Sequence, residues 1–162
     1  GEGYEPEMFY AVEPSIQMYI AEKSEALREL YVSSYSYAAT ANYIHQMATD
    51  KLVELFGAMH PQYTRQDFYE LELATSGMVR SFMARKCDRN FTMEQKLRRF
   101  LSCSMTIYGV AEEKQQQVID RVLEMDLKSV ADQLVADAIH QADEQYQEAE
   151  RKGKAIEAAR NG

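Results

Sequence analysis

Apolar residues recur at intervals of three and four along most of this chain, which is the spacing of one face of an α-helix. The clearest series lies in Ala39–Phe56, where Ile, Met and Leu residues return at this interval. Gly57 and Pro61 follow and predict the end of that helix. No segment of useful length alternates apolar and polar residues as a half-buried β-strand does. The pattern therefore predicts an all-α protein.

Two further helices are predicted from their first residues. The sequence Thr64–Asp67 has the form of a capping box, in which the first and fourth side chains each bind the other's backbone N–H. It predicts a helix that ends near Lys86. Thr92–Gln95 is a second capping box, and Gly109 predicts the end of the helix that follows it.

The remaining apolar segments predict shorter or less regular helices. Pro14 is tolerated in a first helical turn and Ser24 is a good N-cap, so each predicts a helix start. The segments predicted in this way are Ile16–Ala21, a short helix after Ser24, Ala111–Glu124, and Leu127 to about Arg151. We expect one helical domain over residues 1–151 and a polar, frayed tail over 152–162.

Composition limits the functions that the chain can have. Its 162 residues are 46% hydrophobic and 27% charged, which suits one domain with a real core. No apolar run approaches ~18 residues and no signal peptide is present, so we expect a cytoplasmic protein without membrane contact. The net charge of −8 disfavours binding to nucleic acid by this segment. The chain begins with Gly rather than Met, which indicates a trimmed or partial sequence.

The sequence contains no convincing pattern for catalysis or for metal binding. His45, His60 and His140 lie on separate segments, and no glycine-rich phosphate loop or nucleophile motif is present. A single Asp137–His140 pair has the spacing of a carboxylate-bridged metal site, but such a site needs two pairs. Cys87 and Cys103 are far apart and are expected to be free thiols. We therefore expect no enzyme activity, no catalytic residues, no metal and no cofactor.

The segment Tyr31–Thr49 has no charged residue, although it is rich in hydroxyl groups and contains four tyrosines. Tyrosines that serve only as core are inefficient, because a buried hydroxyl without a partner costs roughly 1–3 kcal/mol. Lining a cavity uses both the ring and the hydroxyl. The alternative is that these tyrosines sit half exposed at helix ends. The residues that we expect to line a cavity are Tyr19, Tyr35, Tyr43, Met47, Met78 and Phe82, with Thr75 on the same helical stripe as the last two.

The segment Asp67–Met83 is apolar around its circumference, and Glu72 and Arg80 bound a stretch without charge. A helix of this kind is buried on more than one side, either by a partner subunit or as the central helix of a monomer. Gly77 would allow a close helix crossing. Arg80 is expected either to form an ion pair or to bind an anionic group of a ligand.

Two stretches together resemble a known family. They are LELATSGMVRSFMARKCDRNFTMEQKLRRFLSCSMTIYGV and the upstream YIAEKSEALRELYVSSYSYAATANYIHQMATDKLVELFG. Over about Tyr19–Val110 they are similar to the C-terminal half of TetR-family transcriptional regulators. The resemblance implies a multi-helix orthogonal bundle. It also implies a homodimer whose four-helix bundle is formed by Thr64–Lys86 and Thr92–Tyr108.

The resemblance further implies an effector-binding and dimerisation domain that controls DNA binding. Its helix-turn-helix is absent, so DNA would be bound only through an N-terminal domain outside this chain, and the helices after Gly109 extend beyond the simplest family pattern. The expected ligand is a small, partly apolar or aromatic effector. A helical protein-interaction scaffold without a small-molecule ligand is the alternative. The residues expected at the dimer interface are Ser76, Gly77, Val79, Met83, Leu97, Leu101, Ser104 and Tyr108.

Overall fold

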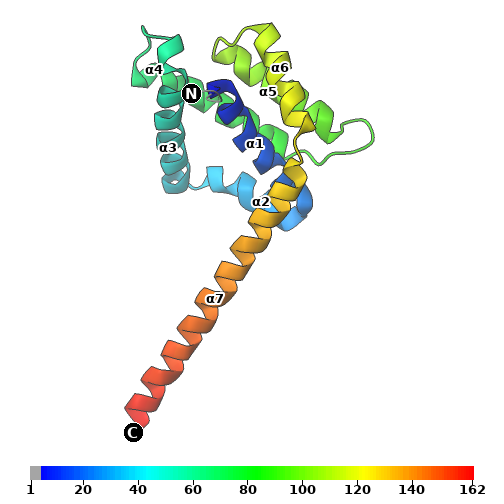
Figure 1. The fold of residues 1–162 in the computed structure, drawn as a ribbon. Helices are drawn as coiled ribbons and strands as arrows, with labels where there is room; N and C mark the ends of the chain where they lie inside the picture. Colours follow the sequence, from blue (N-terminus) through cyan, green and yellow to red (C-terminus); the bar gives the residue numbers. More distant parts are fainter. Residues whose placement is uncertain (1–4) are drawn as a thin grey trace.

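The computed structural model describes residues 5–162, and these form seven α-helices, two short 3₁₀ segments and no β-strand. The prediction of an all-α protein is therefore confirmed. Residues 1–4, the start of the predicted 1–151 domain, lie outside the described residues. The elements are α1 (Pro6–Lys23), α2 (Glu25–Ser33), η1 (Ser34–Ser36), α3 (Ala38–Phe56), η2 (Gly57–Met59), α4 (Arg65–Met83), α5 (Met93–Ile107), α6 (Glu112–Glu124) and α7 (Leu127–Asn161), shown in Figure 1.

Helix α1 lies at the centre of the fold and packs against every other α-helix. The sequence predicted a helix over Ile16–Ala21 only, whereas α1 begins at Pro6, and Pro14 lies inside it rather than in its first turn. The N-terminal Pro6 is well suited to a first helical position. Small buried side chains such as Ala11 and Ser15 let neighbours approach α1 from several sides. Ser24 caps α2 as predicted, because its side chain accepts a hydrogen bond from the N–H of Leu27.

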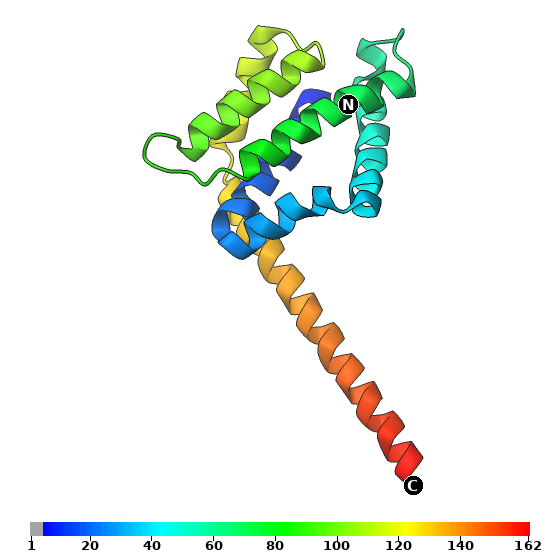
Figure 2. The same cartoon turned by 180° about the vertical axis from the view of Figure 1, so that it is seen from behind.

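The other helices pack around α1 as two pairs (Figure 2). Helices α3 and α4 contact each other on one side, and α5 and α6 contact each other on the other, while α4 also contacts α5. Both predicted capping boxes are present, at Thr64 and at Thr92. Gly109 ends the α5 region with a φ of 73°, and a side chain there would collide with His60 at 2.9 Å. These local signals fix where the long helices begin and end.

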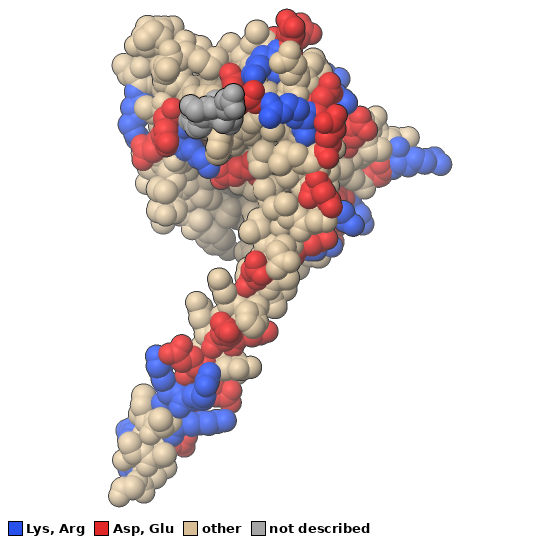
Figure 3. All heavy atoms as spheres, in the orientation of Figure 1, with Lys and Arg blue, Asp and Glu red and all other residues tan. Residues whose placement is uncertain are grey.

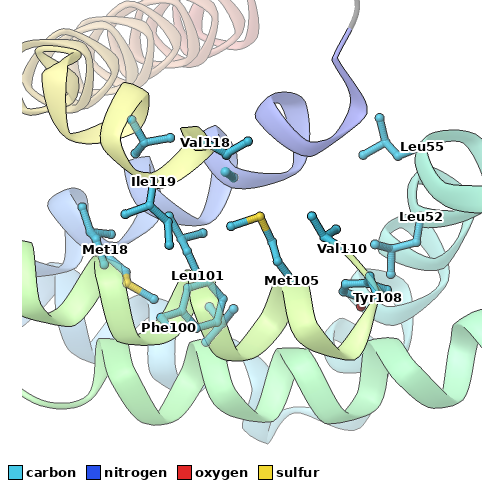
Figure 4. Close-up of a cluster of buried hydrophobic side chains, with 14 of the residues drawn as sticks. Met18, Leu52, Leu55, Phe100, Leu101, Met105, Tyr108, Val110, Val118 and Ile119 are labelled. Carbon is cyan, nitrogen blue, oxygen red and sulfur yellow. The ribbon is translucent and has the colours of Figure 1, made fainter. Parts of the chain in front are cut away.

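A hydrophobic core joins α1, α3, α5 and α6 (Figure 4). Met18 of α1 lies among Phe100, Leu101 and Met105 of α5 and Ile119 of α6, and all five are fully buried. Burying a side chain of this size stabilises the fold by about 1.5–3 kcal/mol relative to leaving it in water. At the edge of this core the rings of Phe56 and Tyr108 stack with centroids 5.1 Å apart. Tyr108 thereby connects the core to the space between α1, α3 and α4.

Most side chains predicted for a dimer interface are instead buried within one chain. Met83, Leu97, Leu101, Ser104 and Tyr108 have 0–1% of their surface exposed. They fill the space between α1, α4, α5 and α6, so these side chains cannot also meet a second copy without unpacking the core. A dimer would have to use residues other than these five.

Helix α4 is buried on one side rather than around its circumference. Ser76 and Val79 face the interior of the chain, while Leu73 is 40% exposed. Gly77 is exposed, and a side chain added there would meet nothing within 4 Å. Within the chain no close helix crossing requires this glycine. The apolar character of α4 was therefore a poor guide to its surroundings, because α1 is the central helix.

Helix α7 has 35 residues and continues to Asn161, so the prediction of a frayed tail after Arg151 is wrong. It is roughly 52 Å long at 1.5 Å per residue. Leu127 and Ala131 are its buried residues, and every residue from Ala136 onward is exposed. Figures 1 and 2 show that α7 leaves the body and extends away from it. Among the described residues no helix is both long and apolar enough to span a membrane.

Candidate functional site

A groove of about 460 Å³ lies between α1, α3 and α4, with α2 and η1 beside it. Its volume is in the range of small-molecule sites. Five tyrosines contribute to its walls, together with apolar and acidic residues. The lining residues are Tyr10, Glu13, Pro14, Gln17, Tyr31, Ser34, Tyr35, Tyr43, Ile44, Met47, Ala48, Lys51, Leu52, Leu55, Glu72, Thr75, Ser76, Val79 and Tyr108.

The phenols of the partly buried Tyr10 and the buried Tyr108 form part of the groove wall. The hydroxyls of Tyr108 and Thr75 are hydrogen bonded at 2.7 Å, and Tyr10 packs edge-on against Tyr108 with ring centroids 5.3 Å apart. Burial raises the pKa of both Tyr10 and Tyr108 well above the ordinary value. Both phenols are consequently neutral at physiological pH, and each offers a hydroxyl as a donor or an acceptor.

The mouth of the groove is formed by the charge-free segment of the sequence. Tyr31 and Tyr35 are half-buried, while Tyr43 and Met47 are 66% and 55% exposed. Tyr43 and Met47 are four residues apart on α3, so they lie on one face of that helix. Aromatic and methionine side chains at an open rim can adjust to guests of different shape.

A buried carboxylate gives the groove its charge. Glu72, on α4, is 3% exposed, and one of its oxygens lies 2.7 Å from Nδ1 of His45 on α3. Burial raises the pKa of Glu72 above its ordinary value, and His45 together with the Ser76 hydroxyl offsets only part of that effect. Glu72 is thus a carboxylate that the protein compensates incompletely, and it lines an open space.

A second acidic residue lies at the rim. Glu13 of α1 is ion-paired with Lys51 of α3 across the opening. Both side chains are about half exposed, so this pair contributes little stability. Because Lys51 is neutralised by Glu13, the charge left over in the lining is that of Glu72.

The structure brings together half of the residues that were predicted to bind a ligand. Tyr35, Tyr43, Met47 and Thr75 line the groove. The other four lie elsewhere: Met78, Arg80 and Phe82 on parts of α4 that do not line the groove, and Tyr19 on α1. Phe82 packs against Phe91 and Phe100, Met78 and Tyr19 pack against the core from other sides, and Arg80 is exposed and donates to Ser36 Oγ at 3.2 Å.

Sequence reasoning missed the groove residues that come from outside the charge-free segment. Tyr10 lies on the part of α1 that was not predicted to be helical. Glu72 was treated as the boundary of an uncharged stretch, and a lone acid is usually solvated. Its four-residue spacing from Ser76, on the same face as Thr75, is the signal that could have placed it inward. Tyr108 was assigned to a subunit interface.

A second carboxylate, the partly buried Glu22, provides a contrast with Glu72. Glu22, at the end of α1, accepts a hydrogen bond from the backbone N–H of Cys87 at 3.0 Å. It also lies 3.4 Å from Arg28 and 3.5 Å from Lys96, a lysine that is 1% exposed. Although burial raises the pKa of Glu22, the Cys87 N–H and the two cations together bring it below the ordinary value. No groove adjoins Glu22 among those described above, so we interpret this cluster as structural.

Another apolar groove of about 460 Å³ runs along the outer side of α1, beside the start of α7. Met8, Val12, Ile16 and Leu134 contribute to it. It lacks a set of convergent polar groups that would orient a ligand. Elsewhere in residues 5–162, no group of three His, Cys, Asp or Glu side chains is placed to hold a metal ion.

Comparison with known proteins adds no assignment. The sequence matches no protein-family model, and no curated protein and no solved structure matches it. What the groove can bind must therefore be inferred from its own chemistry.

Proposed function

We propose that this chain is a ligand-binding domain whose α1–α3–α4 groove holds a small organic cation with an aromatic or bulky apolar body. The observation that carries this proposal is the position of Glu72, a buried carboxylate that lines an open groove among tyrosines. Burying a carboxylate whose partners offset only part of the burial cost is unfavourable, and a cationic guest would reduce the remaining cost.

The surrounding side chains suit the same class of ligand. The faces of tyrosine rings attract cations by about 0.5–2 kcal/mol, depending on how far the site is desolvated. Tyr31 and Tyr35 lie beside the groove, and the phenols of Tyr10 and Tyr108 can bind a polar substituent. Leu52, Leu55 and Val79 provide apolar contact. An anionic ligand would meet Glu72 and is disfavoured, because the charges of Glu13 and Lys51 offset each other.

We infer that ligand binding serves to regulate an attached domain, as in the TetR-type regulators that Tyr19–Val110 resembles. The groove is formed by elements inside that range together with the part of α1 that precedes it. A ligand that binds one arrangement of α1, α3 and α4 better than another would shift the equilibrium between them. The DNA-binding domain, the homodimer and the cytoplasmic location belong to this proposal.

Three probes of the same shape test the groove. We expect 1-naphthylmethylamine to bind with a Kd of about 10–100 µM, 1-naphthalenemethanol more weakly, and 1-naphthoic acid not measurably, as followed by isothermal titration calorimetry. Ala48→Phe should abolish binding because Ala48 is half-buried in the groove wall. Ala74→Phe is the matched control, since Ala74 is exposed on the outer side of α4.

Two results would contradict the proposal. One is an unchanged affinity for the amine in Ala48→Phe, provided that circular dichroism shows the variant to be folded. The other is equal binding of the amine and the carboxylate. The alternative function, a protein-interaction scaffold, is favoured by one observation, the long exposed α7. It would be supported if none of the probes bound.

A further inference from the structure

The exposed part of α7 carries a continuous apolar stripe. Between Val135 and Ile156 its members recur at alternating steps of four and three, and none of them is charged. This is the spacing of the a and d positions of a coiled coil. Ile139, Tyr146 and Ile156 are 59%, 71% and 61% exposed. The members are Val135, Ile139, Ala142, Tyr146, Ala149, Gly153 and Ile156.

Charged side chains of α7 lie off this stripe. Ion pairs join Glu148 to Lys152 and Glu150 to Lys154 along the helix, and His140 Nε2 lies 3.2 Å from Glu144. Figure 3 shows charges of both signs on the protruding helix with uncharged surface between them. Such pairs keep the other faces of the helix in water. The stripe is the side of α7 that is suited to contact with another helix.

The stripe also continues the face that already packs within the chain. Leu127 and Ala131 precede Val135 by two turns and one turn on the same side of α7, and both are buried. Their neighbours include α1, and Lys23 of α1 lies 2.5 Å from Asp132. One helical face therefore has two parts, of which the first is covered by the body and the second extends past it.

We propose that the stripe pairs with the same stripe of a second copy of this chain, with the two α7 helices antiparallel. A parallel pair would put both bodies at one end, and each body already occupies the side toward which the stripe faces. Parallel pairing would gain a contact between Lys152 and Glu157 in each direction, but exposed pairs of this kind contribute only about 0.2–1 kcal/mol. The exclusion of one body by the other is the larger effect.

Side-chain sizes favour the same orientation. With the twofold axis between Tyr146 and Ala149, the large Tyr146 ring faces the small Ala149 of the second copy. In the flanking layers Ala142 faces Gly153, and Ile139 faces Ile156. A parallel pair would instead set Tyr146 against Tyr146 and form three layers of alanine or glycine alone, whereas the antiparallel pair has only its two Ala142–Gly153 layers, and underpacked layers cost stability.

The first test measures self-association of the whole chain by analytical ultracentrifugation. We expect a dimer at about 100 µM, and Tyr146→Lys should weaken association at least ~10-fold because a charge then replaces the central ring. Gln147→Lys adds the same charge beside the stripe and should leave the dimer intact. A monomeric wild-type chain, or a Tyr146→Lys variant that dimerises as well as the wild type, would overturn the proposal.

The second test determines orientation by disulfide formation, with Cys87 and Cys103 replaced by serine. Chains with Ala142→Cys alone should not cross-link to each other, because antiparallel pairing separates the two positions by about 16 Å along the axis. A mixture of Ala142→Cys and Gly153→Cys chains should form a mixed cross-linked dimer, since these positions face each other. Self-cross-linking of Ala142→Cys would indicate parallel pairing and would refute the antiparallel proposal.

Discussion

Glu22 and Glu72 are carboxylates on two helices of the same bundle, α1 and α4, and both lie largely out of solvent. Glu22 is surrounded by two cations and a backbone N–H, and its pKa is lowered. Glu72 is hydrogen bonded to His45 at 2.7 Å, and burial raises its pKa. The first carboxylate is compensated by the chain itself, whereas the second lines a groove.

The comparison shows how a structural charge and a candidate binding charge differ. Burial of a carboxylate is unfavourable at both positions, and only the number and kind of partners separate them. At Glu22 one oxygen accepts from the Cys87 N–H, while the other, Oε2, faces Lys96 and Arg28 as an ion-pair partner without a hydrogen bond. At Glu72 the partners offset only part of the cost of burial, so a cation in the groove would stabilise its charge. The contrast predicts different consequences when each acid is removed.

Replacing Glu22 should have the largest effect on stability. Glu22→Ala leaves Lys96 and Arg28 buried without their shared partner, which should lower the free energy of unfolding by about 3 kcal/mol. Urea denaturation measures this change. Glu25→Ala is the control, because Glu25 also pairs with Arg28 but is 68% exposed, and its loss should cost less than about 1 kcal/mol. Equal losses in the two variants would mean that the Glu22 cluster is not a structural centre.

Breaking the hydrogen bond between Thr75 and Tyr108 should have a smaller effect on stability. Thr75→Val removes the partner of the Tyr108 hydroxyl, a buried hydrogen bond of 2.7 Å, and should cost about 1–2 kcal/mol. Tyr108→Phe removes the other partner. The double variant should lose less stability than the sum of the two single variants, because the hydrogen bond can be lost only once. If the two losses of stability were strictly additive in a double-mutant cycle, the hydrogen bond between Thr75 and Tyr108 would not contribute to stability.

The two acids should affect the pH dependence of stability in opposite directions. Because the folded state raises the pKa of Glu72, its contribution to the free energy of unfolding falls as pH rises from about 4.5 through the folded pKa. For Glu22 the pKa is lowered, so its contribution is present above about 4.5 and is lost as pH falls through the folded pKa. One proton gives a slope of at most about 1.4 kcal/mol per pH unit.

Glutamine variants separate these slopes in denaturation curves measured at a series of pH values. The free energy of unfolding of Glu72→Gln should increase relative to that of the wild type as pH rises. For Glu22→Gln, the loss in free energy of unfolding relative to the wild type should be smallest at the acidic end of the series. Slopes of the same sign for the two variants would contradict the assignment of the two environments.

Substitution of Gly77, on the exposed side of α4, should give the smallest effect, because Gly77 has no neighbour that a methyl group would meet. Gly77→Ala should stabilise the fold by about 0.5–1 kcal/mol, since alanine favours a helix and nothing lies within 4 Å of the new methyl group. Thermal unfolding at low protein concentration measures it. A clear loss of stability there would indicate that Gly77 is in a contact that the single chain does not contain.

The elements with strong local signals could be predicted from the sequence. The capping boxes at Thr64 and Thr92 and the end at Gly109 are confirmed because each depends on a few neighbouring residues. The start of α1 was missed because Pro14 was taken as a first-turn residue. The end of α7 was missed because Gly153 and the polar residues near it favour fraying, yet the helix continues to Asn161.

The site was predictable in part for a related reason. The charge-free segment led to Tyr35, Tyr43 and Met47, which do line the groove. Glu72 could not be assigned in this way, since its burial depends on how α4 is rotated against α1 and α3. That rotation is a property of the whole core and leaves little trace in the local sequence.

The most direct test of the central claim is a titration of the wild type and of Glu72→Gln with 1-naphthylmethylamine and with 1-naphthalenemethanol. Both proteins would carry Tyr43→Trp at the rim, which gives a single fluorescent reporter because the chain has no other tryptophan. We predict that the substitution weakens amine binding about tenfold, equivalent to 1.4 kcal/mol, and leaves alcohol binding unchanged. An equal effect on both probes, or none on the amine, would contradict the role of Glu72 as the charge that selects the ligand.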